Sequence, residues 1–230
     1  VMTLNNKYYS LQIMFMLWLF IVHPTDQRAQ SNPEVAALLA FKNKLTDPNG
    51  FLSHWSIGYS SDPCNWDHIV CNSDYSSVEE INLGNGWLSG QLVPELSNLK
   101  SLKKLDLHAN QLTGKIPAEL GNLANLETMN LQYNQLSGCI PLELGALQNL
   151  QYMFLNNNHF TCYLPWSLGA LLKLKTLHLQ NNQLSGPILV HSFVYLTANG
   201  VDMDFSGNPL LCTPVNDIND NDPTHCHDIL

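Results

Sequence analysis

A repeat of 24 residues runs through most of this chain and limits what it can fold into. The copies begin at Val78, Leu102, Leu126, Leu150 and Leu174. Apolar residues recur at places 1, 4, 6 and 11 of each copy; in the second copy these are Leu102, Leu105, Leu107 and Leu112. Places 4 and 6 share one face of an extended segment, because successive side chains of a strand alternate. We therefore predict a solenoid of five coils, each contributing one short strand and burying its leucines against its neighbours.

Place 9 of the repeat is an asparagine in the last four copies: Asn110, Asn134, Asn158 and Asn182. An amide that turns inward where the chain leaves the strand can bond the backbone of neighbouring coils through both its oxygen and its nitrogen. Gly86 occupies this place in the first copy. We predict an asparagine ladder that begins at the second coil.

The segments around the repeats differ from them in pattern. After Leu184 a two-residue insertion precedes a degenerate sixth strand with Met203 and Phe205, followed by Asn208. Upstream, Pro33 and the apolar spacing after it predict a short amphipathic helix. Trp55 and Trp66 follow, and we expect them to plug the open end of the first coil; ligand contact is the alternative use of these rings. We divide the chain into a cap at residues 30–77, repeats at residues 78–212, and a C-terminal cap with an acidic tail at residues 213–230.

The first residues predict export. Residues 11–22 form an apolar run broken only by Gln12, which is too short to span a bilayer and is typical of a secretory signal peptide. We expect cleavage between His23 and Gln30, which makes residues 1–29 the signal peptide and the mature protein secreted to the apoplast or cell wall. No later segment reaches the roughly 18 consecutive apolar residues of a membrane span.

Six cysteines, an even number in an exported chain, favour disulfides. Cys64 and Cys71 lie just before the repeats, and Cys212 and Cys226 just after them, so we predict one bridge at each end. Cys139 and Cys162 occupy places 14 and 13 of adjacent coils. One coil spacing of ~4.8 Å and one residue of ~3.3 Å would put their Cα atoms roughly 5.8 Å apart, within disulfide range. Adjacent places point in opposite directions, so this pair is either an inter-coil disulfide or two thiols.

The composition excludes several functions. Only 13% of residues are charged, and the net charge of -9 with ten Lys and Arg leaves no basic patch for nucleic acid or an anionic membrane. The chain contains no glycine-rich phosphate loop, nucleophile elbow or paired metal-ligand spacing. We therefore expect no catalysis, no cofactor and no metal.

Several motifs resemble one family. The repeat x-x-L-x-G-x-I-P is similar to the plant extracellular subtype of the leucine-rich repeat. The run DPCNWDHIVCN at residues 62–72, LGN at residues 83–85, LVPEL at residues 92–96 and GNPLLC at residues 207–212 resemble the ectodomain of the somatic embryogenesis receptor kinases. Small secreted proteins share that ectodomain, and the similarity runs from Asn32 to Cys212. The resemblance implies an α/β solenoid: a right-handed leucine-rich-repeat superhelix of five coils plus a degenerate terminal coil, disulfide-capped at both ends.

The same resemblance implies a binding function. In those receptor kinases the ectodomain is a co-receptor that docks beside a larger receptor through its cap and concave face. We expect a secreted, kinase-less relative, monomeric alone, that binds a receptor ectodomain or a peptide or hormone complex in plant signalling or defence. The family has an aromatic residue before the cap histidine, whereas this chain has Asp67 before His68. The family has tyrosines in the second coil, whereas this chain has Lys104 and His108. Direct contact of the cap with a steroid hormone is therefore not implied.

Two other functions compete with this reading. The polygalacturonase-inhibiting proteins, which block a pathogen's cell-wall-degrading enzyme, resemble this chain in repeat type. They use about twice as many coils, whereas five coils give a concave surface only ~24 Å long at ~4.8 Å per strand. A structural wall protein would carry Pro-rich or Tyr-rich extensions.

Places 3, 5, 7 and 8 of each coil should face solvent on the concave side, because the leucines at places 4 and 6 face the core. We predict the partner-binding patch on coils three to five, at Thr128, Asn130, Gln132, Tyr133, Tyr152, Phe154, Asn156, Asn157, Thr176, His178, Gln180 and Asn181. Phe154 has no folding reason to be exposed in mid-strand, and with the tyrosines it would form an apolar anchor. The alternative is that these are ordinary exposed aromatics. Asp67 and His68 in the cap are the second candidate site.

Overall fold

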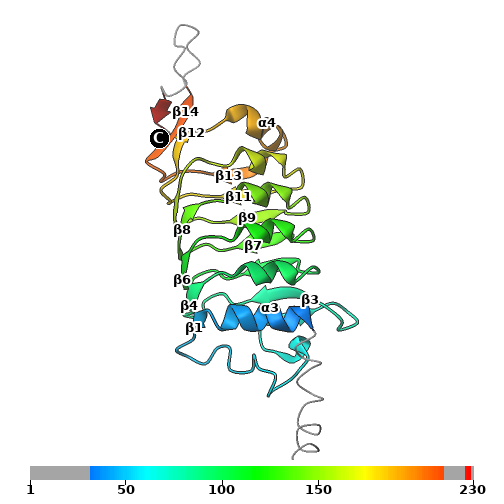
Figure 1. The fold of residues 1–230 in the computed structure, drawn as a ribbon. Helices are drawn as coiled ribbons and strands as arrows, with labels where there is room; N and C mark the ends of the chain where they lie inside the picture. Colours follow the sequence, from blue (N-terminus) through cyan, green and yellow to red (C-terminus); the bar gives the residue numbers. More distant parts are fainter. Residues whose placement is uncertain (1–31, 215–225, 229–230) are drawn as a thin grey trace, which may run out of the picture.

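The structure, a computed structural model, describes residues 32–214 and 226–228 (Figure 1). The predicted signal peptide at residues 1–29 lies outside these residues. The described chain winds into stacked coils that form an open solenoid, which confirms the predicted fold class (Figure 1).

One seven-stranded sheet, here called the long sheet, runs the length of the solenoid and corresponds to the predicted concave face. In spatial order its strands are β13 (Asp202–Asp204), β11 (Thr176–His178), β9 (Tyr152–Phe154), β7 (Thr128–Asn130), β5 (Lys104–Asp106), β3 (Val78–Asn82) and β2 (Ile69–Cys71). The coil strands are parallel and keep place 4 opposite place 4, as with Leu105 and Met129. Only the cap strand β2 is antiparallel. The predicted sixth strand is confirmed as β13.

Most coils contribute a second strand, so the prediction of one strand per coil was wrong. The lateral sheet contains β1 (Leu45–Thr46), β4 (Ser89–Gln91), β6 (Gln111–Gly114), β8 (Gln135–Cys139) and β10 (His159–Thr161). Glycines at place 13 lie within it; Gly114 and Gly138 both have φ +79°, which lets the chain turn there. The fifth coil instead pairs β12 (Ser185–Pro187) with β14 (Leu210–Pro214), and β14 pairs with β15 (Cys226–Asp228). These segments of two to five residues are too short to show a clear period-2 pattern, and for that reason the sequence did not reveal them.

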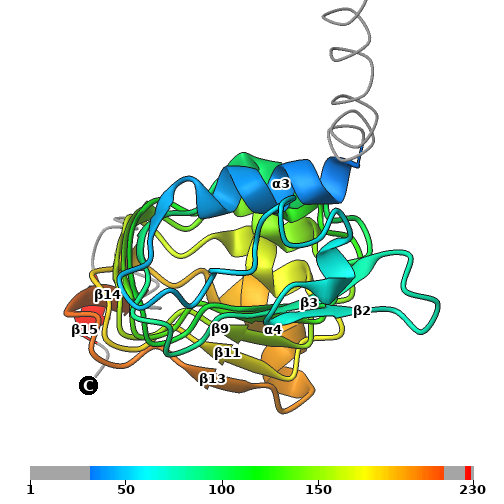
Figure 2. The same cartoon turned by 90° about the horizontal axis from the view of Figure 1, so that it is seen from below.

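Helices cover the side opposite the long sheet, as the end-on view in Figure 2 shows. The predicted helix is α3 (Pro33–Lys42), where the Asn32 side chain caps the N-terminus by accepting from the Glu34 N–H at 2.9 Å. Short 3₁₀ helices follow: η1 (Pro63–Asn65), η2 (Pro94–Asn98), η3 (Ala118–Asn122), η4 (Leu142–Ala146) and η5 (Trp166–Ala170). In the last coil α4 (Val190–Ala198) takes this position and absorbs the two-residue insertion, because Thr176 pairs with Tyr152, 24 residues back, but with Asp202, 26 residues ahead.

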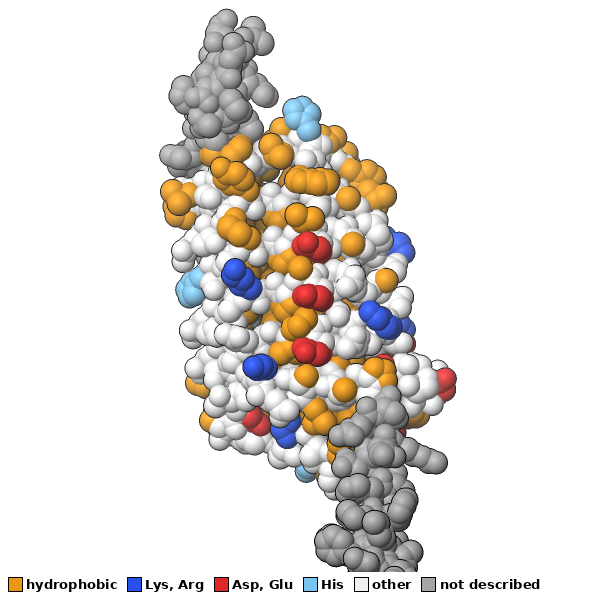
Figure 3. All heavy atoms as spheres, in the orientation of Figure 1, with side chains coloured by type: hydrophobic (Ala, Val, Ile, Leu, Met, Phe, Trp, Pro, Cys, Tyr) orange, Lys and Arg blue, Asp and Glu red, His pale blue; other side chains and the backbone are white. Residues whose placement is uncertain are grey.

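The helical side carries two kinds of surface (Figure 3). Acidic side chains form a column along its middle, where Glu95, Glu119 and Glu143 lie in the first turns of η2, η3 and η4. Apolar side chains gather toward the C-terminal end, among them Trp166 and Val194.

The core is one continuous apolar column. Every residue at places 1, 4, 6 and 11 of the five coils is at most 4% exposed. At the open N-terminal end, Trp55 and Trp66 are buried with their ring centroids 5.9 Å apart, which confirms that they plug the first coil.

The predicted asparagine ladder is present and starts at the second coil. The Asn110 side chain accepts from the Leu88 N–H at 2.9 Å and donates to the Leu83 carbonyl at 2.7 Å, so it bonds the coil before it at two points. Asn134, Asn158 and Asn182 repeat these contacts. Asn208 extends the ladder into the terminal coil.

The predicted Cys64–Cys71 disulfide is confirmed, and of the two alternatives for Cys139 and Cys162 the structure has the inter-coil disulfide. Cys64 bridges Cys71 with 5.6 Å between their Cα atoms, and Cys139 bridges Cys162 with 5.2 Å. Cys212 is also disulfide-bonded, on strand β14, which pairs with the strand that contains Cys226. The side chain of Cys226 lies outside the described residues, so the pairing of Cys212 with Cys226 stays a prediction.

Candidate binding face

The outward face of the long sheet divides into two halves with different side chains. We call the cap edge and coils one and two the N-terminal half; it presents Asp67, His68, Glu80, Asn82, Asn85, Lys104, Asp106 and His108. We call coils three to six the C-terminal half; it presents Thr128, Asn130, Gln132, Tyr133, Tyr152, Phe154, Lys175, His178, Asp202 and Asp204. The buried leucines at places 4 and 6 fix the orientation of both sets, because strand side chains alternate between the two faces.

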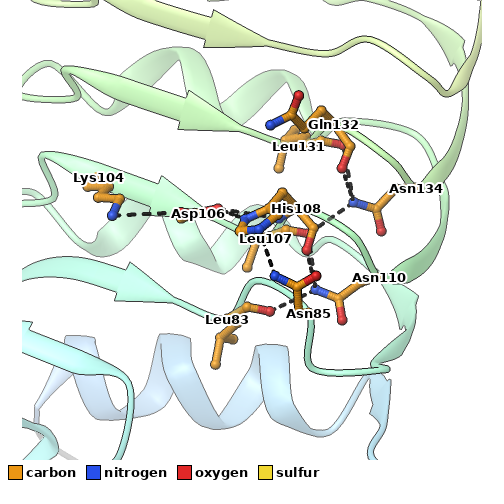
Figure 4. Close-up of polar contacts among 10 residues, drawn as sticks. All are labelled: Leu83, Asn85, Lys104, Asp106, Leu107, His108, Asn110, Leu131, Gln132 and Asn134. Carbon is orange, nitrogen blue, oxygen red and sulfur yellow. Dashed lines mark hydrogen bonds and ion pairs between the residues drawn. The ribbon is translucent and has the colours of Figure 1, made fainter.

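The N-terminal half contains a polar network centred on Asp106 (Figure 4). The Asp106 carboxylate lies 2.6 Å from Nδ1 of His108 and 3.7 Å from Nζ of Lys104. The other ring nitrogen of His108 lies 2.8 Å from the amide nitrogen of Asn85. A Cβ at Gly84 would collide with the His108 ring, so the ring keeps this position only beside a glycine. The polar groups of this half therefore bond largely to one another.

The second predicted site, Asp67 and His68, adjoins this network. The Asp67 carboxylate pairs with Nδ1 of His54 at 2.5 Å, and the His68 ring stacks on Phe51 with centroids 4.0 Å apart. The His68 carbonyl accepts from the Asn82 N–H at 2.9 Å, which ties the cap to β3. Strand β2 thereby continues the long sheet, and the cap residues lie at its N-terminal edge.

An aromatic cluster occupies the C-terminal half. The rings of Tyr152 and Phe154 are nearly parallel, with centroids 6.4 Å apart, and His178 meets Phe154 edge-on at 5.4 Å. Lys175 Nζ lies 5.5 Å from the centre of the Tyr152 ring. His178 Nε2 lies 2.9 Å from the Asp202 carboxylate. We call Tyr152, Phe154 and His178 the aromatic cluster. Lys175 and Asp202 place charges of both signs at its rim.

The structure corrects two expectations about the predicted patch. Asn156 is only 2% exposed and does not face solvent, because place 7 lies where the chain bends in from the strand toward the ladder. The Asn156 carbonyl accepts from the Tyr133 N–H of the preceding coil at 3.1 Å, and the next N–H, of Asn157, donates to the Gln180 carbonyl of the following coil at 2.9 Å. Phe154 is half-buried between its aromatic neighbours and not fully exposed. Tyr133 is the openly exposed aromatic, at 55%.

Sequence reasoning missed the acidic edge of this half. Asp202 and Asp204 occupy places 3 and 5 of the terminal coil, and the patch as predicted ended at coil five. The Asp-Met-Asp-Phe alternation at residues 202–205 was a usable signal. Hydrogen bonds from the Ser206 side chain and backbone, with a smaller contribution from the charge of His178, lower the pKa of Asp204 below its usual value of 3.8.

Across residues 32–214 no cluster of three or more His, Cys, Asp or Glu side chains could hold a metal ion. No helix in the part of the chain that the structure describes is both long and apolar enough to cross a membrane.

Comparisons with known proteins agree with this architecture. Residues 31–72 match the family described as "Leucine rich repeat N-terminal domain", and residues 101–123, 125–147, 149–171 and 173–193 match "Leucine Rich Repeat". A curated relative, leucine-rich repeat protein 1 of Arabidopsis thaliana, is 39% identical over 96 residues, which cover 42% of this chain and 41% of that protein. The chain thus matches less than half the length of this relative.

Solved structures of plant ectodomains align with a larger share of the chain. A chain in the crystal structure of the BIR3–SERK2 complex from Arabidopsis thaliana is 33% identical with a TM-score of 0.68, covering 80% of this chain and 98% of that one. The BIR2 ectodomain from the same plant is 31% identical with a TM-score of 0.69, covering 78% and 94%. The fold described above is similar to that of these plant ectodomains. The chain belongs to the leucine-rich-repeat family of plant proteins.

Proposed function

We propose that this chain is a secreted, non-catalytic module that binds another extracellular protein through the C-terminal half of the long sheet. Its role would be co-receptor-like, in plant signalling or defence. The aromatic cluster of Tyr152, Phe154 and His178 is the observation that carries the proposal.

The physical basis is the residue type and its support. Interfaces concentrate binding energy in a few aromatic and charged anchors surrounded by contacts that exclude water. Phe154 is the last residue of β9, where a strand of a neighbouring coil pairs with it on each side, so little side-chain freedom would be lost on binding. Lys175 and Asp202 at the rim could pair with a partner's charges. Similar folds support a protein partner, since one of them is in a complex between BIR3 and SERK2.

The test is surface plasmon resonance of the purified protein against a panel of plant receptor-kinase ectodomains. For any ectodomain that binds, Phe154→Ala should weaken affinity about thirtyfold or more, because loss of an interface anchor costs at least about 2 kcal/mol. Trp166→Ala is the matched control, because it removes another exposed aromatic side chain, on η5 and outside the long sheet. It should change affinity much less.

Equal affinity of wild type, Phe154→Ala and Tyr152→Ala would contradict the proposal and move the interface to the cap around Asp67 and His68. Inhibition of a fungal polygalacturonase without binding to any ectodomain would instead favour the inhibitor function.

A further inference from the structure

A second exposed aromatic, Trp87, lies away from the aromatic cluster, at place 10 of the first coil. Its side chain is 65% exposed and its backbone φ is +56°. The left-handed region is unfavourable for a bulky residue, so this conformation is maintained against strain. The same place in the next four coils is polar: Gln111, Gln135, His159 and Gln183. The repeat itself therefore does not require a tryptophan here.

Trp87 also differs from the tryptophans of the cap. Trp55 and Trp66 are buried, and their Nε1 atoms donate to the carbonyls of Asp67 and Ser60 at 2.7 and 3.0 Å. Within the described residues the indole of Trp87 donates no hydrogen bond. Trp87 thus serves neither the core nor the internal polar network, and its ring face and N–H are both available.

Trp87 borders a pocket of about 300 Å³, which it lines with Asn85, Ala109, Asn110 and Gln111. This volume lies at the low end of the range for small-molecule sites, about 300–1,000 Å³. The wall is fixed, because the ladder holds Asn110 by its bonds to Leu88 and Leu83. The His108 ring orients the amide of Asn85, and Figure 4 shows this contact and the bond from Asn110 to Leu83.

The lining indicates the chemistry of a ligand. None of the five residues ionises, and the His108 ring that bonds the Asn85 amide also pairs with the Asp106 carboxylate at 2.6 Å. A charged ligand would find no counter-charge in this lining, and a purely apolar one would leave the Asn85 side-chain oxygen and the Gln111 amide unpaired. A ligand with an apolar ring face and hydroxyls at its edge would satisfy both surfaces. The C–H face of a sugar can cover the indole while its hydroxyls donate to and accept from the amides.

We propose that the Trp87 pocket is a binding site for a neutral carbohydrate, such as the end of a cell-wall oligosaccharide. Trp87 supplies the stacking platform, and Asn85 and Gln111 supply the polar contacts. The site is separate from the aromatic cluster and adds a second ligand class to the proposed function, on which it does not depend.

The test is isothermal titration calorimetry with cellotetraose, xylotetraose and mannotetraose, and with tetragalacturonate as the charged comparator. At least one neutral tetrasaccharide should bind, and more tightly than tetragalacturonate. Trp87→Ala should weaken that binding roughly tenfold or more, since each tenfold in affinity corresponds to about 1.4 kcal/mol. Trp166→Ala is the matched control, because Trp166 is similarly exposed, at 60%, but lies on η5, outside the pocket. It should bind like wild type.

A second pair of variants keeps the test decisive if Trp87→Ala does not fold. Gln111→Ala should weaken binding, whereas Gln135→Ala, at the same place one coil on, should not. No binding of any neutral tetrasaccharide up to about 10 mM would overturn the proposal, because that limit excludes even weak millimolar affinity. Binding that survives both Trp87→Ala and Gln111→Ala, or binding of tetragalacturonate in preference, would also overturn it.

Discussion

In coils one and two, places 3 and 5 of the long sheet carry Glu80, Lys104 and Asp106, whereas in coil four they carry Tyr152 and Phe154. Both halves rest on the same buried leucines and the same ladder. The charges of the N-terminal half lie close to opposite partners, as in the contacts of Asp106 with His108 and Lys104. The rings of the C-terminal half contact one another but remain partly open to solvent.

This difference shows how one scaffold can separate structure from recognition. Partly exposed ion pairs contribute little to stability, about 0–1 kcal/mol each, and a partner must compete with the existing bonds to use them. Half-open aromatic rings still have apolar surface to bury, and that surface is worth about 25 cal/mol per Å² on binding. The C-terminal half therefore has more to gain from a protein partner. In the N-terminal half, the apolar surface that a ligand could bury lies at the margin, on the exposed Trp87 ring.

The largest effect should come from breaking the ladder that both halves share. Asn158→Ala removes the acceptor for the Leu136 N–H and the donor to the carbonyls of Leu131 and Leu155, all of them buried contacts. Because each buried polar group left unpaired costs about 1–3 kcal/mol, we expect the free energy of unfolding to fall by roughly 3 kcal/mol or more. Urea denaturation followed by circular dichroism measures this.

Asn149→Ala is the control for the ladder. Asn149 donates to the Ala124 carbonyl and accepts from Nζ of Lys173, and because both bonds are exposed their loss should cost about 1 kcal/mol or less. A loss of similar size in both variants would show that the ladder contributes no more than an ordinary surface bond.

Removing a disulfide should lower the stability slightly less, and it should affect one half of the solenoid more than the other. The Cys139–Cys162 disulfide joins the third and fourth coils, behind the C-terminal half, and closes a loop with a sequence separation of 23 residues. Replacing both cysteines by serine should lower the free energy of unfolding by about 3 kcal/mol through the restored freedom of the unfolded chain. Because coils of a solenoid contact only their neighbours, amide hydrogen exchange should quicken mainly in coils three and four.

The double variant Cys64→Ser, Cys71→Ser is the comparison for this bridge. Its loop is shorter, with a separation of 7 residues, so the loss should be smaller and the faster exchange should appear in the cap. Uniformly faster exchange along the whole chain in both variants would mean that the two halves open as one unit.

The sequence predicted the scaffold better than the face. The period, the ladder starting at Asn110, the plug of Trp55 and Trp66 and the two-residue insertion all depend on residues buried by their own coil or its neighbours, and a fixed period reports such contacts directly. The burial of Asn156 was not predicted, because it depends on the bend of the chain after the strand. The network around Asp106 was not predicted either, since it depends on side-chain directions across coils.

The smallest effect concerns pH and should have opposite signs at the two ends. At the N-terminal end the Glu34 carboxylate accepts from the Val78 N–H, and burial raises its pKa above its usual 4.5 despite that bond. Glu34 therefore contributes stability below pH 4.5, which is lost as the pH rises through its raised pKa. At the C-terminal end the lowered pKa of Asp204 contributes stability above pH 3.8, which is lost as the pH falls through that lowered value.

Melting temperatures of wild type, Glu34→Gln and Asp204→Asn between about pH 3 and 7 test this opposition. Glutamine keeps an oxygen that can accept from the Val78 N–H but cannot ionise. The melting temperature of Glu34→Gln relative to that of wild type should therefore be higher at pH 7 than at pH 3. Asp204→Asn weakens the bonds to Ser206, so its melting temperature relative to that of wild type should be lower at pH 7 than at pH 3. If the two differences from wild type change with pH in the same direction, the environments of the two carboxylates are not opposed, and the contrast between the two ends of the solenoid does not extend to their electrostatics.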